Sequence, residues 1–269
     1  MVLDFHVHTF PDAIAPRTLE KLSRISGLTP STLGTLDSTR QKLREWGVDR
    51  AVLLNVATKP SQQTTINNCA AANQDEMFFC FGSIHPDAPD AIEELYRIRE
   101  LGLRGVKLHP DYQNFFVNED RMAPIYEALV KLSLPVVIHA GYDPLSPDTV
   151  HAQPKAIAEV VRSYPGLSLI GAHMGGMYRF DEVEEYLVGE HLYLDMSLAC
   201  DACSPEQFER IVRSHGAGKI LFGSDTPWGN SRDAIAYLQA SGLTREEKDK
   251  IFYQNGLKLL GMDTTAAEN

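Results

Sequence analysis

The chain begins Met1-Val2-Leu3-Asp4-Phe5-His6-Val7-His8-Thr9, in which apolar and polar side chains alternate. Alternation at a period of two residues is typical of a β-strand, because successive side chains point to opposite faces. We predict a strand over residues 2–7, with Asp4, His6 and His8 directed to one face. Two imidazoles about 7 Å apart along one strand face are able to close on a single divalent cation. The motif is short, so a metal site also requires ligands from other parts of the chain.

Seven further short apolar runs follow, each preceded by a segment with helical periodicity. We predict strands over residues 50–56, 78–84, 104–109, 135–139, 168–173, 192–196 and 219–225. The predicted helices cover residues 17–25, 38–46, 62–73, 88–101, 120–132, 154–163, 181–188, 205–215, 232–240 and 244–260. Strands that alternate with helices run parallel with right-handed crossovers, and eight of them fit a closed barrel.

The predicted fold class is therefore α/β, a (β/α)8 TIM barrel. It carries an inserted loop and helix after the first strand and extra helices at its C-terminal end. A doubly wound open sheet is the alternative, but this chain lacks the glycine-rich phosphate loop that such sheets usually show. A length of 269 residues fits one barrel, so we predict a single TIM-barrel domain over residues 1–269.

Composition and charge restrict the classes of partner. The chain is 43% hydrophobic and 23% charged, and its 25 Lys and Arg against 36 Asp and Glu give a net charge of −11. This charge argues against nucleic acid and anionic membranes, and favours a small-molecule substrate. Met1 leads directly into the first strand without a basic segment, so we expect no signal peptide and a cytoplasmic location. Four cysteines suggest no disulfide framework, and a homodimer is the base-rate expectation.

Metal-binding side chains gather at the ends of the predicted strands. Five of the nine histidines lie at or near strand C-termini, and one aspartate ends the eighth strand. These residues are His6, His8, His109, His139, His173 and Asp225. Because the C-terminal ends of all barrel strands meet at one rim, we expect these side chains to face a common site. Imidazoles with one carboxylate are a ligand set typical of borderline divalent metals such as zinc.

The same residues stand in motifs that resemble the amidohydrolase superfamily. The motifs are D-F-H-x-H from Asp4, G-V-K-L-H-P from Gly105, V-V-I-H-A-G from Val136, G-A-H-M-G-G from Gly171, F-G-S-D-T-P from Phe222 and N-G-L-K-L-L-G from Asn255. More narrowly, the chain is similar to the amidohydrolase-related branch that includes aminocarboxymuconate semialdehyde decarboxylase-like enzymes. The resemblance covers essentially the whole chain, with the motifs in the expected order.

The resemblance implies one divalent metal at the barrel mouth, with His6, His8, His139 and Asp225 as its ligands. Zinc is favoured by the ligand types, manganese or iron are alternatives, and a second metal is left open. Asp225 and His173 would be the catalytic residues, with His173 a ligand if a second ion binds.

The end of the fourth strand departs from the pattern of binuclear superfamily members, which bridge their metals there with a carboxylated lysine or a glutamate. This chain has His109 at that end and Lys107 two residues earlier. Three roles are open for Lys107: it would be carboxylated, form a salt bridge or hold a substrate carboxylate. His109 would either bind substrate or only cap the strand. Arg179 and Trp228 are further candidate substrate residues on the same rim.

Two reactions of this superfamily lead the hypotheses. The first is metal-dependent hydrolysis, in which a metal-bound water attacks the C–N or C–O bond of a small amide, lactone or ester. Asp225 would take the proton of that water and His173 would donate one to the leaving group. The alternative is non-oxidative decarboxylation of a small unsaturated or aromatic carboxylic acid, with Lys107 and Arg179 as candidate cations for the substrate.

Two other classes are less favoured. The His-x-His opening also resembles phosphoesterase and deoxyribonuclease barrels, but histidines stand here where those barrels tend to place a glutamate ligand. A non-catalytic binding module is disfavoured because a buried group of imidazoles with a carboxylate has little structural use without its metal.

Overall fold

The computed structural model describes residues 1–262 and contains eight β-strands that alternate with helices. The strands are β1 (Leu3–Val7), β2 (Arg50–Leu54), β3 (Phe78–Phe81), β4 (Val106–Leu108), β5 (Val136–Ile138), β6 (Leu169–Gly171), β7 (Tyr193–Asp195) and β8 (Ile220–Leu221). All eight predicted strands are present, and each is shorter than predicted at one or both ends. The α/β class and the (β/α)8 TIM-barrel order of elements are confirmed.

The helices also follow the prediction, with two additions. They are α1 (Ala15–Ser26), α2 (Leu36–Glu45), α3 (Gln63–Ala72), α4 (Ala91–Glu100), α5 (Pro110–Gln113), α6 (Ala123–Leu132), α7 (Pro154–Ser163), α8 (Phe180–Tyr186), α9 (Ala199–Ala202), α10 (Pro205–His215), α11 (Ser231–Ala240), α12 (Arg245–Asp249) and α13 (Asn255–Leu259). The single-turn helices α5 and α9 were not predicted, because four residues are too few to show a helical period. The helix predicted over 244–260 is divided by a π-helical turn, Lys250–Gln254.

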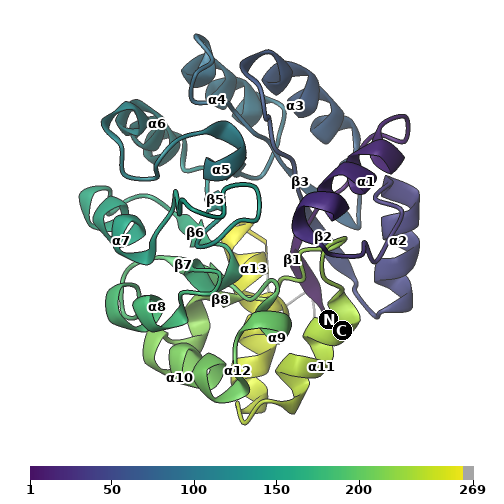
Figure 1. The fold of residues 1–269 in the computed structure, drawn as a ribbon, viewed down its shortest axis with the longest axis vertical. Helices are drawn as coiled ribbons and strands as arrows, with labels where there is room; N and C mark the ends of the chain where they lie inside the picture. Colours follow the sequence, from purple (N-terminus) through teal and green to yellow (C-terminus); the bar gives the residue numbers. More distant parts are fainter. Residues whose placement is uncertain (263–269) are drawn as a thin grey trace. The chain divides into compact units, whose positions relative to one another are not determined.

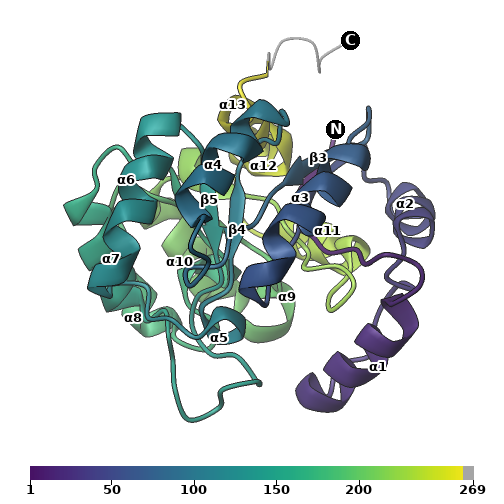
Figure 2. The same ribbon diagram turned by 90° about the horizontal axis from the view of Figure 1, so that it is seen from above.

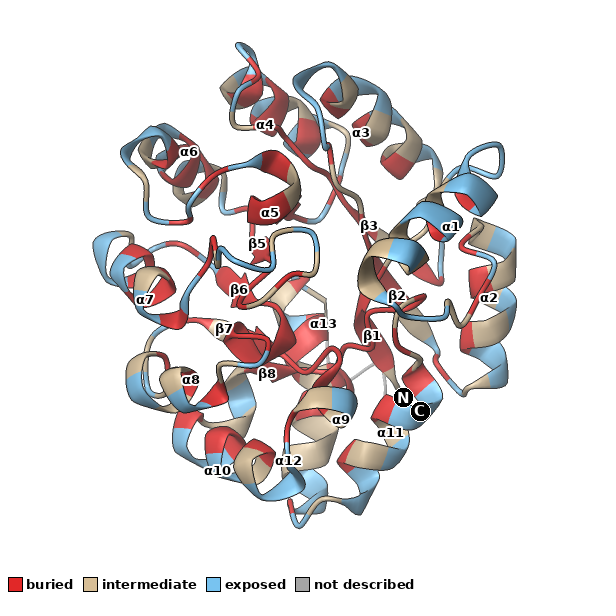
Figure 3. Cartoon of the chain, viewed as in Figure 1, coloured by how far each residue is buried: buried red, intermediate tan, exposed pale blue. Residues whose placement is uncertain are grey.

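Burial explains why the strand sequences are runs of mainly apolar residues. Every residue of β1, β4, β5 and β6 is buried, which is the pattern of parallel strands covered on both faces. Figure 3 shows the strands buried, while the helices alternate between buried and exposed faces. Among the described residues, no helix is both long and apolar enough to cross a membrane.

The chain forms two compact units. Unit 1 comprises Met1–Leu53 with Asp195–Asn269, and unit 2 comprises Leu54–Leu194. The boundaries fall inside β2 and β7. The single domain over residues 1–269 stays a prediction, and its last seven residues, 263–269, lie outside the described part of the chain.

In unit 1, β1 has parallel neighbours on both sides. One neighbour is β2, with Leu3 opposite Arg50 and Val7 opposite Leu53. The other is the segment that starts at β8, where the Phe5 N–H donates to the Phe222 carbonyl at 2.8 Å. The inserted helix after the first strand is α1, which extends away from α12 and α13 (Figure 2).

In unit 2, strands β4, β5 and β6 pair in parallel. Val136 of β5 lies opposite Val106 on one side and Leu169 on the other. Helices α3, α4, α6, α7 and α8 lie outside these strands in chain order (Figure 1). A bridge joins the loops after β5 and β6 at Gly141 and Met177, where a Cβ on Gly141 would lie 2.0 Å from the Met177 nitrogen. The backbone contact at this bridge therefore requires glycine at position 141.

Candidate metal centre

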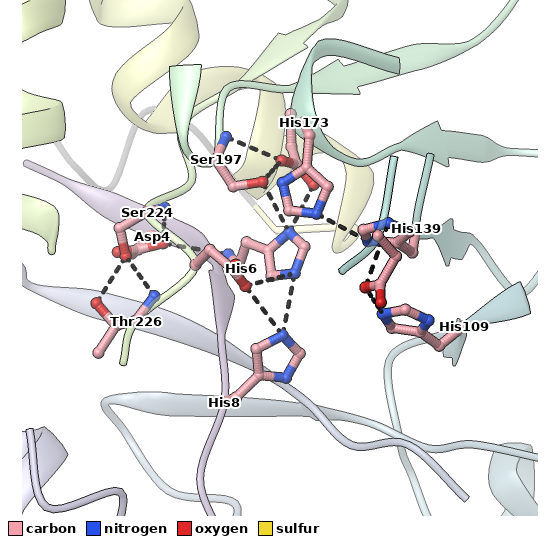
Figure 4. A network of polar contacts seen from close by, with 12 residues as sticks. Asp4, His6, His8, His109, His139, His173, Ser197, Ser224 and Thr226 are labelled. Carbon is pink, nitrogen blue, oxygen red and sulfur yellow. Dashed lines mark hydrogen bonds and ion pairs between the residues drawn. The ribbon is translucent and has the colours of Figure 1, made fainter. Parts of the chain in front are cut away.

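Three of the predicted metal ligands meet in unit 1. The Nε2 atoms of His6 and His8 lie 3.2 Å apart, and Asp225 Oδ1 lies 3.3 Å from the first and 3.1 Å from the second. His6 and Asp225 are buried, whereas His8 keeps 15% of its side chain exposed. Figure 4 shows the two imidazoles with their ring nitrogens directed toward each other. The His-x-His strand and the carboxylate thus form one cluster, with one side open to solvent.

The spacing of these three atoms fits a metal ion. Four ligands that surround zinc tetrahedrally at about 2.1 Å are about 3.4 Å apart, and the three separations here are 3.2, 3.3 and 3.1 Å. Imidazole nitrogen and carboxylate oxygen are also the donors that borderline divalent metals prefer. His6, His8 and Asp225 therefore provide three ligands in a suitable arrangement.

A second layer of contacts orients His6. Its Nδ1–H donates to Asp195 Oδ2 at 2.9 Å, and the Ser197 hydroxyl oxygen lies 3.1 Å from the same nitrogen. Asp195 in turn accepts hydrogen bonds from the Ser197 backbone N–H, at 3.0 Å, and from its hydroxyl. Because the carboxylate places the proton on Nδ1, the Nε2 lone pair is left for a metal, an arrangement common among metal-binding histidines.

Asp225 lies close to the histidines because its backbone is hydrogen-bonded alongside β1. Its N–H donates to the His6 carbonyl at 2.9 Å, and its φ of 62° lies in the left-handed region. Residues other than glycine, asparagine and aspartate seldom adopt that conformation. It turns the chain immediately after β8, so the carboxylate lies beside the imidazoles.

Asp4, the third polar residue of the first strand, anchors the backbone beneath the cluster. Its Oδ1 accepts the N–H groups of His6 and Ser224 at 3.1 and 3.0 Å, and its Oδ2 accepts the Ser231 hydroxyl at 2.7 Å. Complete burial raises the pKa of Asp4 to about 6, while the hydrogen bonds from Ser224 and Ser231 act in the opposite direction. Asp4 thus holds together the strand that carries His6 and the segment that carries Asp225.

The other predicted histidines meet in unit 2. His173 Nε2 lies 3.0 Å from His139 Nδ1, and the His139 ring stacks on His109 with centroids 4.2 Å apart. Asp143 Oδ2 lies 3.5 Å from His109 Nε2 and 3.7 Å from His139 Nε2. His109, His139 and Asp143 form the second group within residues 1–262 whose spacing would allow metal binding.

The remaining candidate substrate residues differ in their surroundings. Lys107 lies in β4 and is 1% exposed. Arg179 is half-buried and forms an ion pair with Glu182 at 2.5 Å. Trp228 is half-buried, and its backbone N–H donates to the Asp225 carbonyl at 2.7 Å. Lys107 therefore lies within a buried strand, whereas Arg179 is partly exposed beside Glu182.

Two polar residues of these clusters were missed from the sequence. Asp195 ends β7, so its position at a strand end matches the signal that singled out Asp225. Asp111 follows His109 by two residues in α5, a helix that was not predicted. His151 is buried, and its Nδ1 lies 2.9 Å from Asp111 Oδ1.

A comparison with known families agrees with these motifs and this fold. A sequence profile of the family described as amidohydrolase matches residues 3–262. The chain belongs to the amidohydrolase family. This assignment confirms the resemblance drawn from the motifs and makes the chain a member of a family of enzymes.

Solved structures share the fold at low sequence identity. A TIM-barrel protein from Bordetella bronchiseptica is 19% identical with a TM-score of 0.78, covering 97% of this chain and 98% of its own. A 5-carboxyvanillate decarboxylase from Novosphingobium aromaticivorans, solved with manganese and a nitrobenzoic acid, is 17% identical with a TM-score of 0.76 (97% and 96% covered). A dihydroxybenzoic acid decarboxylase from Polaromonas, with manganese and 2-nitroresorcinol, is 18% identical with a TM-score of 0.72 (97% and 96% covered). These similarities show the TIM-barrel fold.

Proposed function

We propose that this amidohydrolase-family chain is a divalent-metal-dependent decarboxylase of a small aromatic carboxylic acid. The observation that carries the proposal is the cluster of His6, His8 and Asp225, whose ligand atoms are spaced as a metal requires. Structures of the same fold include manganese-containing decarboxylases of hydroxylated benzoic acids. This support favours decarboxylation over hydrolysis of an amide, lactone or ester, the reaction that led the hypotheses from sequence.

His6, His8 and Asp225 are the proposed ligands, and a bound divalent ion supplies positive charge that attracts and polarises substrate oxygen atoms. His139 was predicted as a fourth ligand. In unit 2 its Nδ1 lies 3.0 Å from His173 Nε2 and its Nε2 lies 3.3 Å from the Tyr142 carbonyl oxygen. We therefore base the proposal on the three ligands of unit 1, and ligation by His139 stays a prediction. The ligand types favour zinc, and the related structures favour manganese.

Decarboxylation breaks the bond between the ring carbon and the carboxylate, releases CO2 and leaves an electron pair that must take up one proton. We propose His173 and Asp225 as the residues that move this proton. His173 Nε2 and His139 Nδ1, 3.0 Å apart, share one hydrogen between them. Lys107 is the proposed cation for the substrate carboxylate, because it is buried in β4, two residues before His109.

The test measures CO2 release from a panel of hydroxylated benzoic acids. Protein loaded separately with Zn²⁺ and Mn²⁺ is incubated with 2,6-dihydroxybenzoate and 5-carboxyvanillate in D2O, with mass spectrometry of the products. We expect one CO2 for each substrate consumed and one deuterium on the ring carbon that carried the carboxylate. Asp225→Asn should lower the rate at least 100-fold, the magnitude typical of removing a positioned proton-transfer group (about 10²–10⁴), and should retain the wild-type circular dichroism spectrum.

The matched control is Asp201→Asn, which removes an exposed carboxylate of unit 1 and should leave the rate unchanged. Methyl esters and lactones of the same acids form the second arm. Hydrolysis of these compounds without CO2 release from any acid would contradict the decarboxylase proposal and favour the hydrolase. Wild-type activity in Asp225→Asn would remove Asp225 from the reaction.

A further inference from the structure

The connection between α1 and α2, residues 27–35, is hydrogen-bonded to the turn that begins at Asp225. Ser31 makes this contact, and all the residues involved belong to unit 1. The Ser31 backbone N–H donates to the Pro227 carbonyl at 2.7 Å. Its hydroxyl donates to the Gly229 carbonyl at 2.6 Å and lies 3.1 Å from the Pro227 carbonyl oxygen. One serine of the inserted segment thus binds two carbonyls of the turn.

The turn, residues 225–229, starts from an uncommon backbone conformation. Asp225 has a φ of 62°, and its carbonyl accepts the backbone N–H groups of Trp228 and Gly229 at 2.7 and 3.2 Å. Sparsely populated conformations of this kind persist where surrounding contacts fix them. The direction of the Asp225 carboxylate therefore depends on the contacts that hold the whole turn.

Those contacts come from two sides. On one side, β1 binds the first half of the turn, because the His8 N–H donates to the Thr226 carbonyl at 2.6 Å. On the other side, Ser31 binds the second half through Pro227 and Gly229. The two sets of hydrogen bonds together fix both ends of the turn.

The connection that carries this serine is itself fixed by hydrogen bonds. Thr32 Oγ1 accepts the Gly34 N–H at 3.0 Å, and Ser38 Oγ, in α2, accepts the Leu33 N–H at 3.1 Å. The Gly34 carbonyl accepts the N–H of Phe10, which lies in the segment after β1, at 2.7 Å. A supporting residue positions its partner more accurately when its own surroundings are locked in this way.

We propose that Ser31 is a positioning residue, which holds the turn 225–229 so that the Asp225 carboxylate keeps its place beside His6 and His8. The inference rests on the proposed function and adds to it a residue of the insertion after β1. Energetic coupling between two sites is reciprocal. A divalent ion bound at Asp225 must therefore stabilise, in turn, the contact between Ser31 and the turn.

The first test needs no metal. Trp228 lies in the turn and is one of two tryptophans, so its fluorescence reports on the turn alone in a Trp46→Phe background. Acrylamide quenching is measured on full-length protein stripped with chelator. We expect Ser31→Ala to raise the quenching constant of Trp228, and Ser31→Thr, which keeps the hydroxyl, to restore the background value. Ser26→Ala is the matched control, because the Ser26 hydroxyl accepts the Leu28 N–H at 3.1 Å within the same insertion.

The second test measures the zinc affinity of the same variants by titration against a competing chelator. We expect Ser31→Ala to weaken Zn²⁺ binding about 10-fold, at the lower end of the range for residues that support a ligand. Ser31→Thr and Ser26→Ala should keep the affinity of the background. An unchanged affinity in Ser31→Ala would overturn the positioning role, whatever the effect of the substitution on the unfolding temperature.

A third measurement uses only the wild type, so it does not depend on the folding of any variant. Amide hydrogen exchange of a peptide over residues 28–36 is compared between stripped and Zn²⁺-loaded protein. We expect zinc to slow this exchange, because the ion stabilises the contact in which the Ser31 N–H donates to Pro227. The same exchange rate in both states would overturn the coupling between Ser31 and the metal centre.

The outcomes separate this inference from the proposed function. Zinc binding and CO2 release by the wild type, with unchanged zinc affinity in Ser31→Ala, would overturn the role of Ser31 and leave the proposed function intact. A wild type that binds no divalent ion would contradict the proposed function. Quenching of Trp228 would then decide the role of Ser31: a rise in Ser31→Ala would support its hold on the turn, and an unchanged value would overturn it.

Discussion

The contact between Asp195 and His6 has the clearest consequence among the single side chains. Asp195 is fully buried and its carboxylate accepts the Nδ1–H of His6 at 2.9 Å. A carboxylate in this position fixes the ring orientation and raises the basicity of the nitrogen that faces the metal. The fully buried Ser197 supports the carboxylate through its backbone N–H. Metal affinity at His6 should therefore depend on Asp195, a residue that does not itself contact the ion.

We predict that Asp195→Asn weakens divalent-metal binding in unit 1 by about 10–100-fold, the range typical of such supporting carboxylates. The amide keeps the size of the side chain but removes its charge. Isothermal titration of the stripped protein with Zn²⁺ measures the effect. Asp201→Asn, an exposed carboxylate in the same unit, serves as the control. An unchanged dissociation constant in Asp195→Asn would show that His6 needs no such support.

Among the elements, β1 and the segment after β8 together build the candidate metal centre. The Asp225 N–H donates to the His6 carbonyl, and the His8 N–H donates to the Thr226 carbonyl at 2.6 Å. Gly223 makes this approach possible, because a Cβ there would lie 3.0 Å from His6 Cβ. The glycine of the F-G-S-D-T-P motif is thus required where the two segments pack most closely.

We predict that Gly223→Ala displaces His6 and lowers both stability and metal affinity. Overpacking of a buried site typically costs about 1–3 kcal/mol, and the displaced imidazole would no longer keep its spacing to His8 and Asp225. Thermal unfolding and zinc titration measure the two effects. Gly218→Ala is the matched control, because a Cβ at Gly218 meets no atom within 4 Å. Equal unfolding temperatures and zinc affinities in the two variants would contradict the role of Gly223.

For the whole molecule, metal binding in unit 1 should be linked to folding. His6 and His8 come from one end of the sequence and Asp225 from near the other, and the three meet only in the folded chain. An ion that binds only the folded state stabilises it by about 2.7 kcal/mol when its concentration is 100 times the dissociation constant.

We therefore predict that chelation lowers the midpoint of thermal unfolding by roughly 5–10 °C, because about 1 kcal/mol corresponds to about 2–4 °C in a chain of this size. Calorimetry with and without EDTA measures the shift, which should grow with added Zn²⁺ or Mn²⁺. In Asp225→Asn the shift should disappear, since a ligand of the proposed metal centre is removed. An unfolding midpoint of the wild type that is the same with and without EDTA would argue against metal binding by the native chain.

The alternation of strands and helices and the strand-end positions of the histidines could all be predicted from the sequence. Such features follow from local periodicity, which every segment carries in its own residues. The pairing of His6 with His8 is also local, because residues two apart on a strand share a face. The family motifs extended this prediction to Asp225, which the structure places beside both histidines.

The partners of each imidazole follow only from tertiary structure. Asp195 lies 189 residues from His6 in the sequence, yet its carboxylate orients the ring. His109 and His139 stack on each other beside Asp143 through the register of β4 with β5 and the loops that follow. Strand register and the left-handed turn at Asp225 determine which side chains meet, and neither is encoded in local periodicity. The sequence therefore identified the candidate ligand side chains, and the tertiary structure determined which carboxylate lies beside each imidazole.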